Sequence, residues 1–284
     1  MDISDILTNV KDLPTLPTIY SQLLEAMSNT RTSAKDISDI IERDQASTLK
    51  LLRTVNSPVF GISTKIDTIQ KAIFFLGFNE VKNIVFSLSI IDMFKNYKPN
   101  PYFSLVDHWK HSIAVGVITR ILGTLINEKL VDNYFVAGII HDIGKLLLLY
   151  HGKIDYSKVI NYVVENNTRI GNAEIAVLGI DHLELGAMVA QKWDIPESLI
   201  NVIKYHLQGT VNGKPDNLVA CVHLADAIAR ALHLGGAGDK VIPRPNPEIW
   251  EILNLDIKQF SNIAPVIIKS YEDAVSILIS SKGH

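Results

Sequence analysis

The segment from Gly138 to Leu146 contains the side chains best suited to chemistry. It places a histidine and an aspartate side by side, as His141 and Asp142, and Lys145 follows four residues after the histidine. Neighbouring residues on a helix point about 100° apart, so His141 and Asp142 can share one metal ion only at a helix end or between helices. Lys145 returns to nearly the same helix face as His141. The segment therefore offers an imidazole, a carboxylate and an ammonium group in one patch.

Two interpretations of this patch are open. The flanking residues are strongly apolar, and burying charged groups among them costs free energy unless the groups are paired or bind a metal. In the first interpretation, Asp142 and Lys145 form an ion pair beside a core histidine. In the second, the patch is part of a metal site, which needs further ligands from elsewhere in the chain.

Four other side chains interrupt apolar helical patterns, as ligands of such a site would: His111, His182, His206 and Asp226. They could converge on the His-Asp pair if their helices pack as a bundle with these side chains pointing inward. Imidazole and carboxylate ligands together suit iron, manganese, nickel or zinc, and the mixture does not choose among these metals. The sequence thus predicts a site for a divalent transition metal.

Helical periodicity dominates the elements that must position these residues. No sustained strand alternation is present, so an all-α fold is predicted. Ser33 with Asp36 forms a capping pair that opens one predicted helix, and Gly77 ends another that begins at Asp67. Further helices are predicted over residues 16–27, 46–55 and 79–94.

The segment Lys98 to Pro101 is the best candidate for a boundary between two parts of the chain. Its two prolines stop any helix and suit a linker. None of the nine histidines precedes His108. We therefore expect an N-terminal helical lobe over residues 1–100, without titratable chemistry, and a second helical lobe over residues 101–284 that carries the site.

The composition excludes several classes of protein. The net charge of −3 gives no excess of basic residues for nucleic-acid or anionic-membrane binding, so no specific nucleic-acid or membrane partner is expected. The most apolar run, residues 135–150, contains the charged groups described above and is not a membrane span. A single cysteine, Cys221, forbids an intramolecular disulfide and is expected to be a buried apolar residue. The N-terminus shows no signal-peptide pattern, so a cytoplasmic protein is expected.

The order of His111, His141-Asp142 and Asp226 resembles the pattern that gives the HD superfamily of metal-dependent phosphohydrolases its name. The resemblance implies that these four residues bind one divalent metal ion. It also implies that His182 and His206 bind a second ion, with Asp142 bridging the two, and that Lys145 lies near a substrate phosphate.

Five further motifs resemble the HDOD domain, the HD-related output domain: Leu13-Pro-Thr-Leu-Pro17, Ile40-Ile-Glu-Arg-Asp44, Leu49-Lys-Leu-Leu-Arg53, Val55-Asn-Ser-Pro-Val-Phe-Gly61 and Ala72-Ile-Phe-Phe-Leu-Gly77. With the HD-type residues, the likeness spans about residues 13–230. It implies an all-α HD-superfamily domain with an additional N-terminal helical lobe.

The resemblance leaves two functions open. HDOD proteins mostly resemble non-catalytic signalling modules, which implies a signalling protein partner bound through the N-terminal lobe. Apolar residues of that lobe that would form the contact surface, where exposed, include Val59, Phe60, Phe74 and Phe75. The alternative is a metal-dependent phosphohydrolase acting on a nucleotide or phosphodiester, in which Asp142 and Lys145 would be the catalytic residues. In either case a nucleotide or phosphate is a candidate ligand.

A cyclic-di-GMP phosphodiesterase is disfavoured. The related HD-GYP enzymes have two adjacent histidines where this chain has His206-Leu207, and their Gly-Tyr-Pro loop is missing from residues 209–217. The remaining histidines are expected to be structural or exposed. Two of them have a nameable alternative: His108 could replace His111 as a ligand, and His223 could support Asp226.

Overall fold

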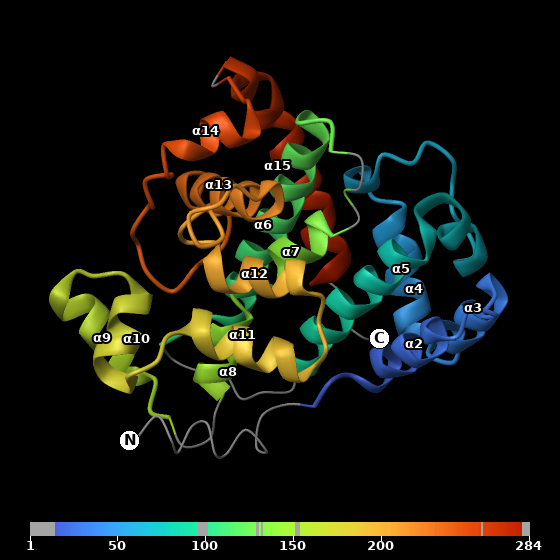
Figure 1. The fold of residues 1–284 in the computed structure, drawn as a ribbon, viewed down its shortest axis with the longest axis horizontal. Coiled ribbons are helices and arrows are strands. Elements are labelled where there is room, and N and C mark those ends of the chain that lie inside the picture. The colour runs from blue at the N-terminus through green and yellow to red at the C-terminus, as the bar shows by residue number, and fades with distance from the viewer. Residues whose placement is uncertain are drawn as a thin grey trace.

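The structure is a computed structural model that describes residues 15–95, 102–128, 131, 133–150, 154–256 and 258–279, with side chains from residue 263 onward in the last range. Helices make up the described secondary structure, and these ranges contain no strand (Figure 1). An isolated bridge joins Val211 to Lys214 around the Asn212-Gly213 turn. The predicted all-α fold is therefore confirmed. The predicted linker 98–101 lies outside the described residues, so the division into lobes at residue 100 stays a prediction.

The N-terminal helices follow the predicted caps. They are α2 (Thr18–Ser28), α3 (Ala34–Glu42), α4 (Gln45–Val55), the short 3-10 helix η2 (Pro58–Phe60) and α5 (Ile69–Phe94). Ser33 and Asp36 form the expected capping box at the start of α3, each side chain accepting a hydrogen bond from the other's backbone. Asp44 and Thr68 cap α4 and α5 more simply, each side chain accepting a hydrogen bond from a backbone N–H of the first turn.

Gly77 divides α5 into two helical segments. Its φ of 80° and ψ of 166° are not helical, so the predicted helix end at this glycine and the predicted restart after it are confirmed. Among the described residues, α5 is the one helix long and apolar enough to cross a membrane by length and composition. However, 56% of its most apolar window is buried inside the structure. This burial is typical of a core helix.

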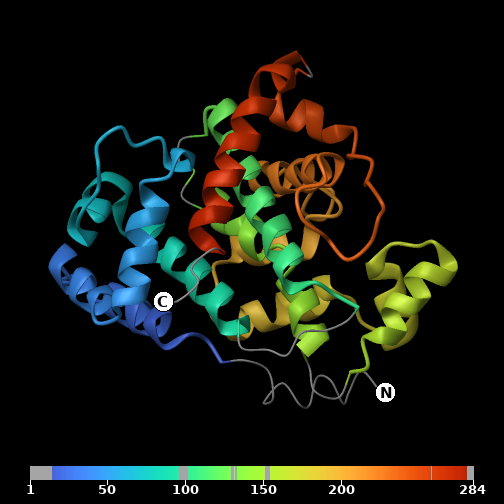
Figure 2. The same cartoon turned by 180° about the vertical axis from the view of Figure 1, so that it is seen from behind.

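The helices that carry the predicted site pack in one group with α6 (Leu105–Leu125). They are α7 (Tyr134–Ile140), α8 (Ile143–Tyr150), α11 (His182–Lys192), α12 (Glu197–Tyr205) and α13 (Asn217–Ala231). The helices α9 (Ser157–Asn166), α10 (Ile170–Leu178), α14 (Glu248–Leu253) and α15 (Lys258–Leu278) lie outside this group. Seen from behind, α15 runs along α6 and reaches α4 and η2 (Figure 2).

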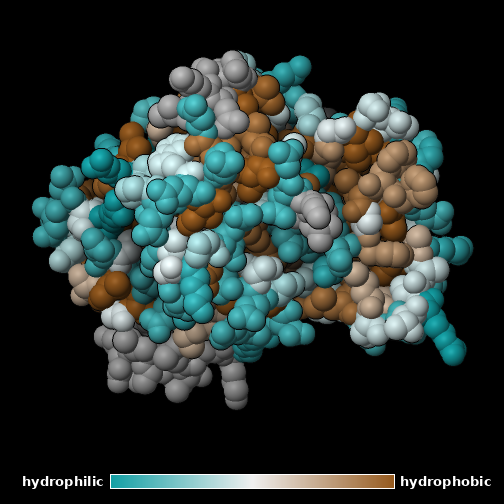
Figure 3. Space-filling view, turned by 45° about the horizontal axis from the view of Figure 1, so that its top comes forward, coloured by the Kyte–Doolittle hydropathy of each residue, from teal (hydrophilic) through white to brown (hydrophobic). Residues whose placement is uncertain are grey.

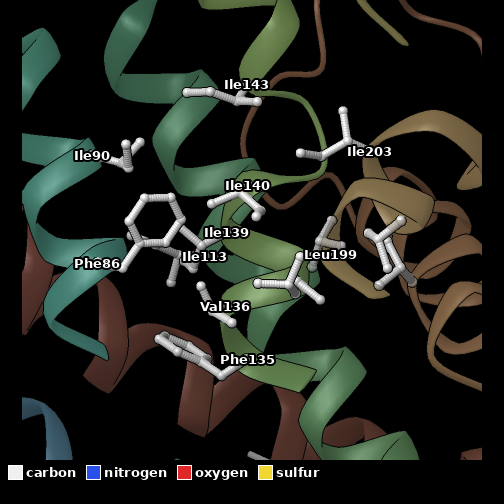
Figure 4. Packing of buried hydrophobic residues seen from close by; sticks show 14 of the residues in the cluster. Phe86, Ile90, Ile113, Phe135, Val136, Ile139, Ile140, Ile143, Leu199 and Ile203 are labelled. Atoms are coloured by element: carbon white, nitrogen blue, oxygen red, sulfur yellow. The ribbon is translucent and has the colours of Figure 1, made fainter. Parts of the chain in front are cut away.

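A hydrophobic core joins the second segment of α5 to the site-bearing helices. Phe86 and Ile90 of α5 point toward Ile139 and Ile140 of α7, and Ile203 of α12 closes the far side (Figure 4). All five side chains are at most 2% exposed. Close packing of this kind resists small displacements, so α5 and α7 hold one another in register.

Arg120 of α6 makes a second connection between the N-terminal helices and the rest of the fold. Its buried guanidinium forms an ion pair with Glu80 of α5 and donates from Nε to the carbonyl oxygen of Val59, 3.1 Å away. The same group lies 4.4 Å from the ring centroid of Phe60. Phe60 and Val59 are therefore packing residues of η2, whereas Phe74 and Phe75 are exposed.

Two glycines let the site-bearing helices approach closely. A Cβ on Gly138 of α7 would overlap the backbone of Gly116 in α6, and a Cβ on Gly144 of α8 would overlap the carbonyl of His182 in α11. These contacts bring α6, α7, α8 and α11 to the separation that the site requires.

We expect Gly138→Ala to destabilise the fold by roughly 1–3 kcal/mol, because the added methyl group forces α7 away from α6. The measurement is the free energy of unfolding from urea denaturation. Gly213→Asn is the control: Gly213 has a φ of 75° and nothing within 4 Å of an added Cβ, and asparagine tolerates this conformation. Equal destabilisation by the two substitutions would contradict the close-contact argument.

Candidate metal centre

The structure brings all six predicted ligands into one buried cluster, here called the metal centre. His141 and Asp142 lie between α7 and α8, as their adjacency required. The others come from four different helices, and the full set is His111 (α6), His141, Asp142, His182 (first residue of α11), His206 (after α12) and Asp226 (α13). None of these residues is more than 3% exposed. That they bind a metal stays a prediction.

The distances divide the centre into two groups that share His141. In the first, His111 Nε2 lies 3.0 Å from Asp226 Oδ1, and His141 joins them with all three ligand atoms within 4.8 Å of one another. In the second, His141, Asp142 and His206 meet the same criterion. Metal bonds of about 2.0–2.2 Å place neighbouring ligand atoms about 3 Å apart, so both groups are compatible with ion binding.

Asp142 occupies the middle of the centre. Its Oδ2 lies 3.3 Å from His141 Nε2, and its Oδ1 lies 3.5 Å from both His182 Nε2 and His206 Nε2. The carboxylate thus faces three imidazole rings from three directions. This arrangement matches the bridging position that the HD resemblance implies.

In His141 and His206, the hydrogen bond of Nδ1 fixes the tautomer of the ring. Nδ1 of His141 is 2.7 Å from the carbonyl oxygen of Gly138, and Nδ1 of His206 is 3.2 Å from the carbonyl oxygens of Val202 and Ile203. Carbonyl oxygens only accept, so Nδ1 carries the proton and Nε2 turns a lone pair toward Asp142.

Glu174 of α10 fixes the third ring, and the sequence analysis missed it. Its Oε2 lies 2.5 Å from His182 Nδ1 and accepts from the His182 backbone N–H at 2.9 Å. Its Oε1 accepts from the Tyr156 hydroxyl at 2.6 Å. A buried carboxylate that holds a ligand histidine is a frequent partner in metal sites. The available signal was a lone glutamate in the apolar sequence of α10.

The unpartnered atoms of the centre provide the test of whether a metal fits. The Nε2 atoms of His141 and His182 and the Oδ1 atom of Asp142 are buried and have no hydrogen-bond partner. They are all acceptors that face one another, and such an arrangement is costly unless a cation lies between them. The residues present therefore fit a metal ion.

The ion-pair interpretation is satisfied only in part. Lys145 does bind Asp142 Oδ2, at 2.5 Å, and it also donates to the carbonyl oxygen of Ala237 at 3.0 Å. This pair accounts for one carboxylate oxygen. It leaves Oδ1 and the facing imidazole nitrogens without partners, so the ion pair alone does not explain the cluster.

The protonation states of the centre suit a metal. Burial alone would raise the pKa of Asp142, but its interactions with His141 and with Lys145 outweigh burial and hold that pKa well below its usual value. Burial lowers the pKa of His206 to about 4. At neutral pH the carboxylate is therefore ionised and His206 is neutral, as metal ligands must be.

Arg230 of α13 supports Asp226 and was also missed, although its i+4 spacing from Asp226 is visible in the sequence. Its Nε donates to Asp226 Oδ1 at 3.0 Å, and its Nη1 donates to Asp239 Oδ1 at 2.8 Å. Burial opposes ionisation of Asp226, yet the Arg230 charge and the adjacent His111 keep the pKa of Asp226 well below its usual range.

Residues 235–243 cross over the metal centre and are here called the covering loop. Asp239 anchors the loop through Arg230 and through the Ile170 backbone N–H, which donates to its Oδ2 at 3.0 Å. Ala237 receives the hydrogen bond from Lys145 already described. A cavity of about 390 Å³ lies between this loop and His111. Beneath the loop the six side chains of the centre are at most 3% exposed, and the cavity borders the centre at His111.

The remaining histidines have structural roles or surface positions. His223 Nδ1 lies 2.7 Å from the carbonyl oxygen of His206, and its Nε2 accepts from the Asn246 backbone N–H at 2.9 Å. It therefore holds the end of α12 in place and does not support Asp226. His108 is buried beside His111 but belongs to neither ligand group, and His233 is exposed. His151 and His284 lie outside the described residues.

These features define a helical domain with a His-Asp centre between helices. Residues 13–208 match the HDOD domain, more than half of the chain, and the protein belongs to the HDOD family. The resemblance found in the sequence is confirmed.

Solved structures show the same fold. An HDOD domain protein of unknown function from Geobacter sulfurreducens is 24% identical, with a TM-score of 0.78 over 97% of each chain. A presumed phosphohydrolase from Shewanella amazonensis SB2B is 22% identical, with a TM-score of 0.73 over 96% of this chain and 97% of that one. A presumed signal transduction protein from Marinobacter aquaeolei VT8 is 19% identical, with a TM-score of 0.70 over 96% of this chain and 61% of that one. At these identities the likeness shows the fold alone.

Two relatives are longer proteins. An uncharacterized protein of Treponema pallidum (strain Nichols) is 23% identical over 204 residues, which are 72% of this chain and 39% of that protein. The uncharacterized protein YuxH of Bacillus subtilis (strain 168) is 38% identical over 82 residues, which are 29% of this chain and 20% of YuxH. The matched part of this chain thus spans less than half the length of either relative.

Acidification should destabilise the metal-free protein. The folded pKa of His206, about 4, lies below the unfolded value, so the unfolded state takes up the proton first as the pH falls below about 6.5. Between pH 7 and pH 5, protonation of His206 in the unfolded state should lower the free energy of unfolding by on the order of 1–2 kcal/mol. Urea denaturation of chelator-treated protein at both pH values measures it. His206→Gln should show a smaller loss over this pH range; the same loss in wild type and variant would refute this account.

Proposed function

We propose that this HDOD protein is a signal-transduction module that binds one or two divalent transition-metal ions at the metal centre and contacts a signalling protein through its N-terminal helices. The observation that supports the metal is the set of buried acceptors around Asp142 that have no hydrogen-bond partner. His111, His141, Asp142 and Asp226 would hold one ion. His182 and His206 would hold the second together with Asp142.

The covering loop favours a regulatory role over catalysis. Lys145, the residue that would contact a substrate phosphate, already binds Asp142 and the covering-loop carbonyl of Ala237. To reach a phosphate it would have to leave the loop. A metal enclosed in this way can stabilise or report a conformation of the helices around it without exchanging substrate.

One observation favours the alternative, a metal-dependent phosphohydrolase. Three cationic side chains, Lys145, Arg169 and Arg230, line a small cavity that also borders His182 and Asp226. These groups would attract the phosphate of a nucleotide or phosphodiester. A bound metal would supply Lewis acidity there. Asp142 would then orient the ion and Lys145 would bind the phosphate.

The cellular compartment is part of the proposal. The one cysteine, Cys221, is fully buried in α13, and burial raises the pKa of its thiol, so the expectation of a small apolar core residue is met. A cytoplasmic location agrees with this unreactive thiol.

The proposal predicts about one to two equivalents of transition metal in protein purified without chelators, by elemental analysis. Asp142→Ala should lose most of the metal, because its carboxylate faces ligands of both groups. Glu174→Gln should lower the affinity by about 10-fold or more, since His182 loses its anionic partner. Asp39→Ala, an exposed carboxylate on α3, is the control and should retain full metal. Metal-free wild type, or undiminished metal in Asp142→Ala, would refute metal binding.

The two functions differ in turnover. Nucleotides, cyclic dinucleotides and generic phosphodiesters should be tested with manganese, iron or nickel supplied. A regulatory module should stay well below an ordinary enzymatic rate of about 1 per second on every substrate. A rate at or above this value that disappears in Asp142→Ala would instead establish the phosphohydrolase.

A further inference from the structure

A groove lies on the N-terminal helices, far in the sequence from the metal ligands. It is enclosed by one face of α4, by residues 62–67 and by the end of α15, on the side seen in Figure 2. Its volume is about 770 Å³, and its apolar lining comes from Leu49, Leu52, Ile62, Ile66 and Ile277. Cavities of several hundred cubic ångströms with an apolar lining are typical of binding sites.

The wall of the groove is built in advance. Asn56, at the end of α4, donates from Nδ2 to the carbonyl oxygen of Ile66 at 2.7 Å, and its Oδ1 accepts from the Ile66 backbone N–H at 2.8 Å. One side chain thus holds both backbone groups of Ile66 and keeps this residue buried. A ligand would find the groove already formed, which reduces the entropy lost on binding.

Apolar side chains continue from the groove onto the adjacent surface. Leu49 is 55% exposed at its edge, and Phe74 and Phe75 are 83% and 47% exposed on the first segment of α5. The Asp67–Lys71 ion pair connects the groove to this segment, and Phe75 lies one helical turn beyond Lys71. Figure 3 shows hydrophobic side chains gathered at the end of the molecule formed by the N-terminal helices. This apolar surface extends beyond what a small molecule would cover.

The rim of the groove is positively charged. Arg53 and Lys65 both line it, and no described residue forms an ion pair with either. The one acidic residue of the lining, Asp67, is already paired with Lys71. Two unpaired cations beside an apolar floor complement a ligand with an apolar face and carboxylates at its edge.

We propose that this groove binds an acidic amphipathic helix of the signalling partner. The apolar face of that helix would pack on Leu49, Leu52 and Ile62, and its carboxylates would meet Arg53 and Lys65. The inference rests on the proposed partner contact of the N-terminal helices and specifies where it lies and what chemistry the partner presents. Nucleic acid is a poor match, because two cations beside an apolar floor provide few phosphate contacts.

The test uses a designed peptide of about 18 residues with leucines on one helical face and glutamates on the other. A counterpart carries lysine in place of glutamate. Binding to the full chain is followed by fluorescence anisotropy at low and high salt. The acidic peptide should bind at least about 10-fold more tightly than the basic one, and added salt should weaken it because the rim charges are exposed.

The variants locate the contact. Arg53→Glu with Lys65→Glu, and separately Leu49→Asp, should each weaken the acidic peptide at least about 10-fold. Lys204→Glu with Lys214→Glu makes the same change of net charge on other elements and should leave binding unchanged. Elemental analysis of every variant should show an unaltered metal content. The groove proposal can therefore be refuted without refuting metal binding at the metal centre.

Any of three results would refute the proposal that the groove binds an acidic helix. The acidic peptide could show no binding tighter than about 1 mM. It could bind equally to the Arg53/Lys65 and Lys204/Lys214 variants. Or Phe74→Ser with Phe75→Ser could abolish binding while the groove variants do not, which would place the partner contact on α5 and keep the proposed function.

Discussion

The buried carboxylate of Asp142 is the constraint around which the fold is arranged. A fully buried anion is stable only if its surroundings supply compensating charge from several directions. Here one oxygen binds Lys145, and the other faces two imidazoles that are themselves held by backbone carbonyls or by Glu174. The helices supplying these groups must therefore converge, and the glycine contacts of α7 and α8 let them do so.

The supporting groups around the ligands form layers of opposite charge. Asp226 is balanced by Arg230, and Arg230 is balanced in turn by Asp239 of the covering loop. Breaking one member would leave another charge buried and unpaired, which costs more than the lost contact itself. The ligand geometry and the position of the covering loop are consequently maintained by one network. This explains how a loop without regular secondary structure stays over the centre.

Much of the fold and most of the ligand set could be predicted from the sequence, for identifiable physical reasons. The capping box of Ser33 and Asp36 and the helix break at Gly77 depend on neighbouring residues alone. The six candidate ligands were visible because a histidine or aspartate within an apolar helical pattern is unusual. Glu174 and Asp239 escaped prediction because their partners, His182 at 8 positions and Arg230 at 9 positions, lie on other elements that only the folded chain brings near. A role of His223 beside Asp226 was an alternative suggested by spacing alone, and the fold turns this histidine toward the end of α12, in agreement with the expected structural role.

The C-terminal helix α15 packs against α6, which carries His111, and also contributes Ile277 to the wall of the groove. One helix thus packs on the element that carries His111 and also borders the groove. If the proposed peptide held α15 in a position that displaced α6, it would change the affinity of the proposed metal centre for an ion. By thermodynamic linkage the ion would change the affinity for the peptide by the same factor. Through α15, a change in metal occupancy would therefore change the affinity for the partner, although the two sites have no residue in common.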